Sequence, residues 1–255
     1  MHFIDSHTHL YLEEFEKDIS ETVKRAVNAG INQMVLPNID STSVQSMLDM
    51  CAKFKDNCYP AIGLHPGSVK DNFKQELEIV RSWLSKEKFV AIGEVGIDLY
   101  WDKTFFEQQV DAFKYQLLLA LEYDLPVIIH SRNALNEIIQ ILNEKIFREV
   151  KAVFHCFPGS LEQAQFLTEK GYLLGIGGVV TYKNSGLAKI VKELPLKTMM
   201  LETDSPYLPP VPHRGQRNES AYIKVIAEFI ATGRQTSVEE VAEITTAAAK
   251  EFFNI

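Results

Sequence analysis

Short apolar segments alternate with longer segments of helical spacing along the whole chain. This alternation limits the possible folds more than any other feature. Eight apolar segments read as buried strands, at residues 3–6, 33–36, 59–64, 90–93, 127–129, 152–154, 172–176 and from 199 onward. The segments between them repeat apolar residues at helical spacing, as at Phe106, Val110, Phe113 and Leu117. Strands that alternate with helices predict a parallel sheet with crossover helices.

The number of units and the chain length indicate how this sheet is arranged. A chain of 255 residues with eight βα units has the usual size of one (β/α)₈ TIM barrel, so we predict an α/β fold with a single domain over residues 1–255. The alternative is a doubly wound open sheet, but no Gly-x-Gly-x-x-Gly turn follows the first strand. Residues 206–218 contain four prolines, and we expect a stiff loop at the active site there.

Composition and charge exclude several classes of protein. The net charge of −8 and the hydrophobic content of 46% allow a large core but argue against coating nucleic acid by bulk charge. We find no signal-peptide pattern and no apolar run long enough to span a bilayer. Three cysteines without metal-binding spacing fit a reducing compartment. We therefore expect a cytoplasmic protein without a membrane partner, and a monomer.

Histidines and carboxylates recur where the predicted strands end. Seven such residues stand at or just after the carboxyl end of a strand: His7, His9, His65, Glu94, His130, His155 and Asp204. In a TIM barrel these ends form the catalytic face. One histidine there could be purely structural, but repetition over several strands favours a shared site. Imidazole and carboxylate are common ligands of divalent metal ions.

Six of these residues predict a pair of divalent ions, which would be Mg²⁺, Mn²⁺ or Zn²⁺. The first ion would be bound by His7, His9 and Asp204, because strand alternation puts the two histidines on one face. The second ion would be bound by His130 and His155. Such a pair can activate water and stabilise a leaving oxygen.

Two carboxylates are the predicted catalytic residues. Glu94 lies between the two histidine groups along the order of strands and is predicted to bridge the ions. Asp204 is predicted to bind the first ion and to take the proton of the attacking water. Two further carboxylates would contact the ligands or neighbouring groups without binding the ions themselves. We expect Glu202 to hold a histidine or a loop, and Asp98 to orient either a ligand histidine or a phosphate-binding group.

Four side chains are candidates for binding a substrate phosphate: His65, Arg132, His213 and Arg214. A guanidinium matches phosphate oxygens in bidentate geometry, although a surface salt bridge would explain either arginine as well. Tyr100, Trp101 and Tyr207 follow predicted strands and are candidates for stacking on a base, with plain packing as the alternative.

Several motifs, taken together, resemble the signature blocks of the TatD-type metal-dependent deoxyribonucleases of the amidohydrolase superfamily. They are Asp-Ser-His-Thr-His at 5–9, Gly-Leu-His-Pro at 63–66, Gly-Glu-Val-Gly-Ile-Asp at 93–98, His-Ser-Arg at 130–132, His-Cys-Phe at 155–157 and Glu-Thr-Asp-Ser-Pro-Tyr-Leu at 202–208. The resemblance implies a TIM barrel, a divalent-metal site and phosphodiester hydrolysis of DNA, as single strands or at ends. It implies metal ligation by the same six residues. Pro158 departs from the pattern, where a serine is more usual.

Three functions remain open at this stage. The first is a metal-dependent deoxyribonuclease or phosphodiesterase. The second is an amidohydrolase or deacylase acting on a small amide or an aminoacyl ester. Many such enzymes bridge their metals with a carboxylated lysine, whereas here the fourth strand offers Glu94 and no lysine ends a strand. The third is a non-catalytic binding or scaffold protein, which the intact ligand set disfavours.

Overall fold

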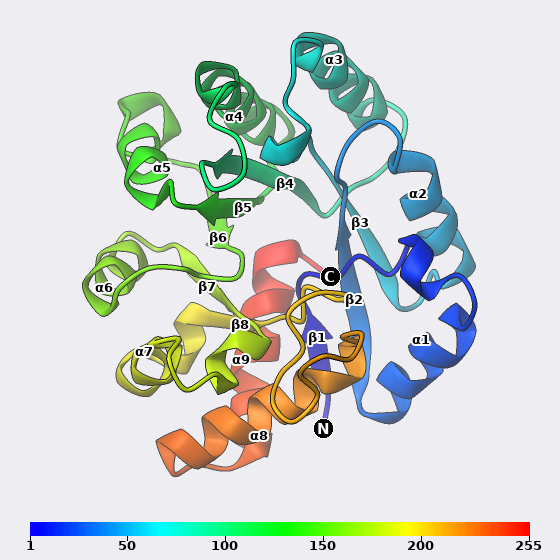
Figure 1. Ribbon diagram of the computed structural model, residues 1–255, viewed down its shortest axis with the longest axis vertical. Coiled ribbons are helices and arrows are strands. Elements are labelled where there is room, and N and C mark those ends of the chain that lie inside the picture. Colours follow the sequence, from blue (N-terminus) through cyan, green and yellow to red (C-terminus); the bar gives the residue numbers. More distant parts are fainter.

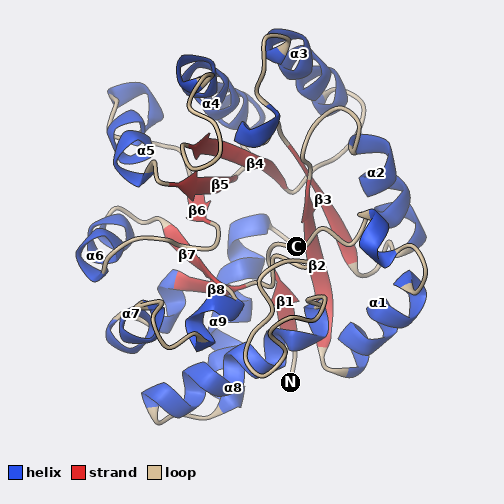
Figure 2. Cartoon of the chain, viewed as in Figure 1, coloured by secondary structure: helices blue, strands red, loops and turns tan.

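A computed structural model describes residues 1–255 and contains one eight-stranded parallel sheet in the order β1-β2-β3-β4-β5-β6-β7-β8 (Figure 1). Helices surround the sheet, as Figure 2 shows in blue around the red strands. The strands are β1 Phe3–Asp5, β2 Ile31–Pro37, β3 Cys58–Ile62, β4 Ala91–Asp98, β5 Val127–Arg132, β6 Ala152–Phe154, β7 Leu173–Ile176 and β8 Met199–Leu201. This sequential order confirms the predicted barrel, because a doubly wound sheet reverses direction at a switch point.

Each strand is followed by at least one helix. The α-helices are α1 Ile19–Asn28, α2 Val44–Lys53, α3 Phe73–Leu84, α4 Phe106–Tyr123, α5 Leu135–Leu142, α6 Leu161–Glu169, α7 Leu187–Glu193, α8 Ile223–Arg234 and α9 Val238–Phe253. Ser160 caps α6 and Ser237 caps α9, since each hydroxyl accepts from a backbone N–H three residues on. None of the helices combines the length and the apolar character that crossing a bilayer requires.

The barrel is nearly closed between its first and last strands. Ser6 N donates to Leu201 O at 3.0 Å, and Asp204 N donates to His7 O at 2.9 Å. Just beyond the strands, Thr8 and Ser205 form a parallel bridge. The two ends of the sequence therefore meet, and this pairing sets the segment after β1 beside the segment after β8.

Two strands extend further towards the C-terminus than we predicted. β4 continues through Glu94 to Asp98, and β5 continues through His130 to Arg132. The backbone keeps pairing because a register irregularity between Ile92 and Val95 absorbs the change in direction around Glu94. Glu94 and His130 therefore lie inside strands, whereas the sequence analysis took the strands to end just before them.

Polar contacts shape the segments near two helices. Ser41 lies before α2 and does not cap it, because its N–H and hydroxyl both donate to Glu76 and the residue before α2 is Ser43. α5 ends at Leu142, and a separate 3₁₀ turn covers Lys145–Phe147.

The end of the barrel where the strands begin is filled by a small apolar cluster. It takes one residue from each of seven strands together with two from α9: Ile4, Val35, Ala61, Ala91, Ile128, Val153, Met200, Ala249 and Phe253. α9 and the C-terminus lie behind the centre of the ring in Figure 1, so they close this end. The opposite end, where the strands finish, is left for polar side chains.

Candidate metal centre

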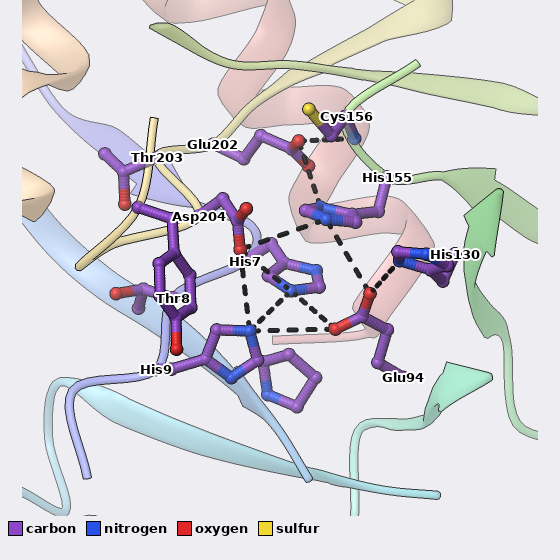
Figure 3. Close-up of polar contacts among 12 residues, drawn as sticks. His7, Thr8, His9, Glu94, His130, His155, Cys156, Glu202, Thr203 and Asp204 are labelled. Atoms are coloured by element: carbon purple, nitrogen blue, oxygen red, sulfur yellow. Dashed lines mark hydrogen bonds and ion pairs between the residues drawn. The ribbon is translucent and has the colours of Figure 1, made fainter. Parts of the chain in front are cut away.

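The structure brings together all six predicted ligands at the carboxyl ends of the strands (Figure 3). They come from five strands or the loops directly after them: His7 and His9 after β1, Glu94 in β4, His130 in β5, His155 after β6 and Asp204 after β8. Four of the six are buried; His130 and Asp204 are partly exposed. The convergence follows from the barrel, since adjacent strands deliver successive side chains to one rim.

The carboxylate of Glu94 lies at the centre of this cluster, and its two oxygens face different histidines. Oε2 lies 3.2 Å from His7 Nε2 and 3.6 Å from His9 Nε2. The two Nε2 atoms are themselves 3.1 Å apart. These three atoms lie close enough together to share one ion.

The other oxygen of Glu94 faces a second group. Oε1 lies 2.8 Å from His130 Nδ1, 3.5 Å from His65 Nε2 and 3.7 Å from His155 Nε2. His65, Glu94 and His130 place one atom each close enough to hold an ion. His65 thus lies within the cluster, although we had assigned it to the substrate and not to a metal.

Asp204 completes the first group through one oxygen only. Oδ1 lies 3.5 Å from His9 Nε2, 3.8 Å from His7 Nε2 and 3.9 Å from His155 Nε2. His155 therefore contacts the Asp204 side as well as the Glu94 side, whereas we had placed it with the second ion alone. All of these contacts use Oδ1, and the side chain keeps 15% of its surface exposed.

The chemistry of this donor set fits divalent cations. Every ion-pair partner of Glu94 and of Asp204 is a histidine, and no lysine or arginine approaches either carboxylate within 4.0 Å. Carboxylate oxygens and imidazole nitrogens thus converge in a buried space with little positive charge of their own. Burying carboxylates in this way is costly unless cations meet them.

The titration of the cluster reflects the same geometry. Burial lowers the pKa of His7, and the neighbouring His155 lowers it further. Burial also opposes charge on His155, but the carboxylates of Glu202, Glu94 and Asp204 outweigh it and raise the pKa of His155 to about 10. The three carboxylates therefore favour positive charge at this point of the cluster.

Two of the predicted ligand histidines are contacted, on the side away from Glu94 or Asp204, by carboxylates that we had expected to act indirectly. Glu202 Oε1 lies 3.1 Å from His155 Nδ1, at ion-pair distance though outside hydrogen-bond geometry, and accepts from Cys156 N at 2.6 Å (Figure 3). Asp98 Oδ2 lies 3.1 Å from His130 Nε2. The structure thus places Glu202 against both a histidine and a loop, and Asp98 against a histidine.

Tyr11 also contacts His9, one of the predicted ligands, and the sequence analysis missed it. Its hydroxyl donates to Pro37 O at 2.6 Å and lies 3.0 Å from His9 Nδ1. The single hydroxyl proton is used on the carbonyl, so His9 Nδ1 must donate to Tyr11. His9 therefore presents an unprotonated Nε2 to the cluster. No motif marks Tyr11, because its role depends on the distant Pro37.

The predicted substrate residues lie around the cluster, with differing contacts. The Arg132 guanidinium lies 3.8 Å from the centre of the Tyr100 ring and 5.1 Å from that of Trp101. These rings are 53% and 76% exposed, so packing alone does not explain them. The Tyr207 ring lies edge-on to His9, with 6.3 Å between centroids.

The remaining two candidates face other partners. His213 stacks on Tyr222 with ring centroids 4.0 Å apart and contacts none of the six ligands. Arg214 lies 4.1 Å above the centre of the Tyr182 ring. Both come from the long loop between β8 and α8.

Comparison with known proteins shows which family this chain resembles. The family model described as TatD related DNase matches residues 4–254. The uncharacterized metal-dependent hydrolase YabD of Bacillus subtilis is 38% identical over 252 residues, which cover 98% of each chain. The crystal structure of YJJV, a TatD homologue from Escherichia coli K12, superposes with a TM-score of 0.93 at 32% identity, covering 99% of this chain and 98% of that one. A TatD family hydrolase from Entamoeba histolytica shares the fold, with a TM-score of 0.86 at 22% identity over 99% and 98% of the two chains.

Proposed function

This chain belongs to the TatD-related DNase family and is a metal-dependent hydrolase, and we propose that it is a deoxyribonuclease that hydrolyses phosphodiester bonds of DNA. One observation carries the proposal: the two oxygens of Glu94 face two separate histidine groups. A carboxylate in this position can bridge two cations, and paired cations suit displacement at phosphorus. The number of ions and their identity as Mg²⁺, Mn²⁺ or Zn²⁺ are part of the proposal.

The ligands in this proposal are the six predicted residues together with His65, which lies beside Glu94 and His130. When bound, the cations would polarise the phosphoryl group and lower the pKa of a water toward about 7. Glu94 would hold the cations at a fixed spacing. Tyr11, Glu202 and Asp98 would keep the ligand histidines oriented, as partners behind metal ligands commonly do.

Asp204 is the proposed general base. Its Oδ1 faces His7, His9 and His155, whereas Oδ2 forms no hydrogen bond and no ion pair with the protein. The free oxygen can therefore accept the proton of the attacking water while the other stays with the ligands. The water's oxygen forms the new bond to phosphorus, the bond from phosphorus to the leaving alkoxide oxygen breaks, and that oxygen takes a proton from solvent water.

Substrate contacts are proposed for the exposed rim. Arg132, supported on Tyr100, keeps the edges of its guanidinium free to donate to phosphate oxygens. The exposed Trp101 offers a face on which a base can stack. Single-stranded DNA or a frayed end suits such a rim, because its bases are accessible for stacking.

One assay separates this function from its alternative. The protein would be loaded with Mg²⁺, Mn²⁺ or Zn²⁺ and given a single-stranded oligonucleotide, bis(p-nitrophenyl) phosphate and an aminoacyl ester. We expect hydrolysis of the oligonucleotide and the generic phosphodiester. Hydrolysis of the aminoacyl ester alone would instead identify a deacylase that uses the same cluster.

A further inference from the structure

A pocket lined by charged, polar and apolar side chains lies on the same face of the barrel, outside the metal centre. It has a volume of about 530 Å³, and its lining includes Thr181, Tyr182, Lys183, Val211 and Arg214. None of the proposed metal ligands lines it. One wall follows β7 and the other belongs to the loop after β8, so both walls start from carboxyl ends of neighbouring strands.

Hydrogen bonds hold the two walls of this pocket together. The Tyr182 hydroxyl donates to Pro209 O at 2.8 Å, and Val211 N donates to Thr181 Oγ1 at 2.9 Å. At Gly178 a Cβ atom would lie 2.4 Å from Leu208 O, so the backbones approach too closely for any side chain there. The pocket is therefore a preformed feature of the fold.

Direct contacts connect the segments that form this pocket to the metal centre. The side chain of Glu202, which contacts His155, packs over Gly177, with its Cγ 3.6 Å from where a Cβ of that glycine would lie. Gly177 directly precedes the segment that forms the first wall. In the loop that supplies the other wall, Tyr207 N donates to Asp204 O at 2.8 Å. Segments that contact the metal centre therefore lead into both walls of this pocket.

The charges in the pocket are not neutralised by the protein. Lys183 and Arg214 are exposed, and neither has a carboxylate partner within 4.0 Å. Arg217, three residues beyond Arg214, instead pairs with Asp18 and Glu219. The Tyr182 ring supports the flat face of Arg214 and leaves its N–H edges free. Two free cations in a chain of net charge −8 suit an anionic ligand.

We propose that this pocket binds a second backbone phosphate of the substrate strand, next to the phosphate at the metal centre. The inference rests on the proposed function, and it narrows the substrate to an oligonucleotide with at least two phosphates. Lys183 and Arg214 donate to the phosphate oxygens, and Tyr182 holds Arg214 in place. A substrate with one phosphate would leave the pocket empty.

The test compares a long and a short substrate in the metal-loaded enzyme. Variant K183Q/R214Q removes both cations, and R148Q/K197Q makes the same charge change at exposed positions just before β6 and β8, at the other end of the barrel. We expect the first variant to lower the ratio of kcat/KM for a single-stranded oligonucleotide to that for bis(p-nitrophenyl) phosphate by roughly 10- to 100-fold. The second variant should leave both substrates at the wild-type level.

Salt dependence provides an independent readout. Oligonucleotide binding, followed by fluorescence anisotropy, should lose about 0.7 in salt slope for each phosphate contact removed, and only in K183Q/R214Q. If that variant lowers both substrates equally or changes neither, the pocket proposal is overturned while the nuclease proposal stands. If the wild-type enzyme hydrolyses only bis(p-nitrophenyl) phosphate and does not bind the oligonucleotide, both proposals fail.

Discussion

The two ends of the barrel are built from the same eight strands but differ completely in chemistry. At the end where strands begin, Ile4, Val35, Ile128 and Met200 pack with α9 into a buried apolar cluster. At the other end, a few residues further along the same strands, buried imidazoles and carboxylates face one another. The first end gains free energy from burial, whereas the second bears a desolvation cost.

The difference shows how one scaffold separates stability from chemistry. Residues of the apolar end should affect folding and leave the reaction alone. Those of the polar end should affect metal binding and catalysis while the barrel stays folded. Substitutions at each end test this division.

Glu94 should give the largest effect on activity. Glu94→Ala removes the proposed bridge, so we expect metal occupancy to fall at both positions and turnover to drop by roughly 10³-fold or more. Glu94→Gln keeps one ligand oxygen and should retain more metal than Ala. Elemental analysis and circular dichroism would check both; full occupancy in Glu94→Ala would sink the bridging role.

Asp204 and His9 should separate two roles within the polar end. Asp204→Asn keeps a ligand oxygen but loses the base, so turnover should fall by roughly 10²–10⁴-fold and excess metal should not restore it. His9→Ala should act mainly through weaker metal binding, and excess metal should partly rescue it. A metal titration of both variants is the measurement. Near wild-type turnover of Asp204→Asn at saturating metal would mean that the base lies elsewhere.

Ile128 tests the apolar end. It is fully buried and its Cβ packs against Gly93, so Ile128→Ala leaves a cavity that should cost about 2–5 kcal/mol of stability. The urea midpoint would report the loss. Turnover per folded molecule should stay near wild type, and a large fall in turnover without a shift in the midpoint would contradict the division between the ends.

Tyr11 should give a smaller effect at the polar end. Tyr11→Phe keeps the ring but removes the acceptor for His9 Nδ1–H, so His9 loses its fixed tautomer. We expect metal affinity to fall by roughly 10- to 100-fold with little change in thermal stability. Competition with a chelator dye measures the affinity; an unchanged value would show that Tyr11 only packs.

The smallest effect concerns Arg217, which lies at the polar end but serves structure. Hydrogen bonds from Arg217 and Arg25 hold the pKa of Asp18 well below its usual range. The stability from this lowered pKa is present above the unfolded value of about 3.9 and is lost as the pH falls below it. In Arg217→Gln the folding stability should therefore fall less steeply as the pH is lowered, and activity near neutral pH should not change. Denaturation midpoints between about pH 5 and pH 2 would detect it.

The sequence by itself determined the barrel and most of the polar cluster. The alternation of apolar and helical segments predicted the eight strands, and the position of His7, His9, His155 and Asp204 at strand ends predicted their convergence. This works because strand periodicity and parallel pairing are local rules, and closing the barrel brings every strand end to one rim.

Only the tertiary structure decided which atoms face each other. Side-chain directions across strands decide three contacts. The two Glu94 oxygens face different histidines, His65 lies beside Glu94, and the Tyr11 hydroxyl contacts His9. The pocket between Tyr182 and Arg214 joins segments about thirty residues apart through hydrogen bonds between side chains and the backbone. Such contacts are set by packing and register, which no local pattern in the sequence encodes.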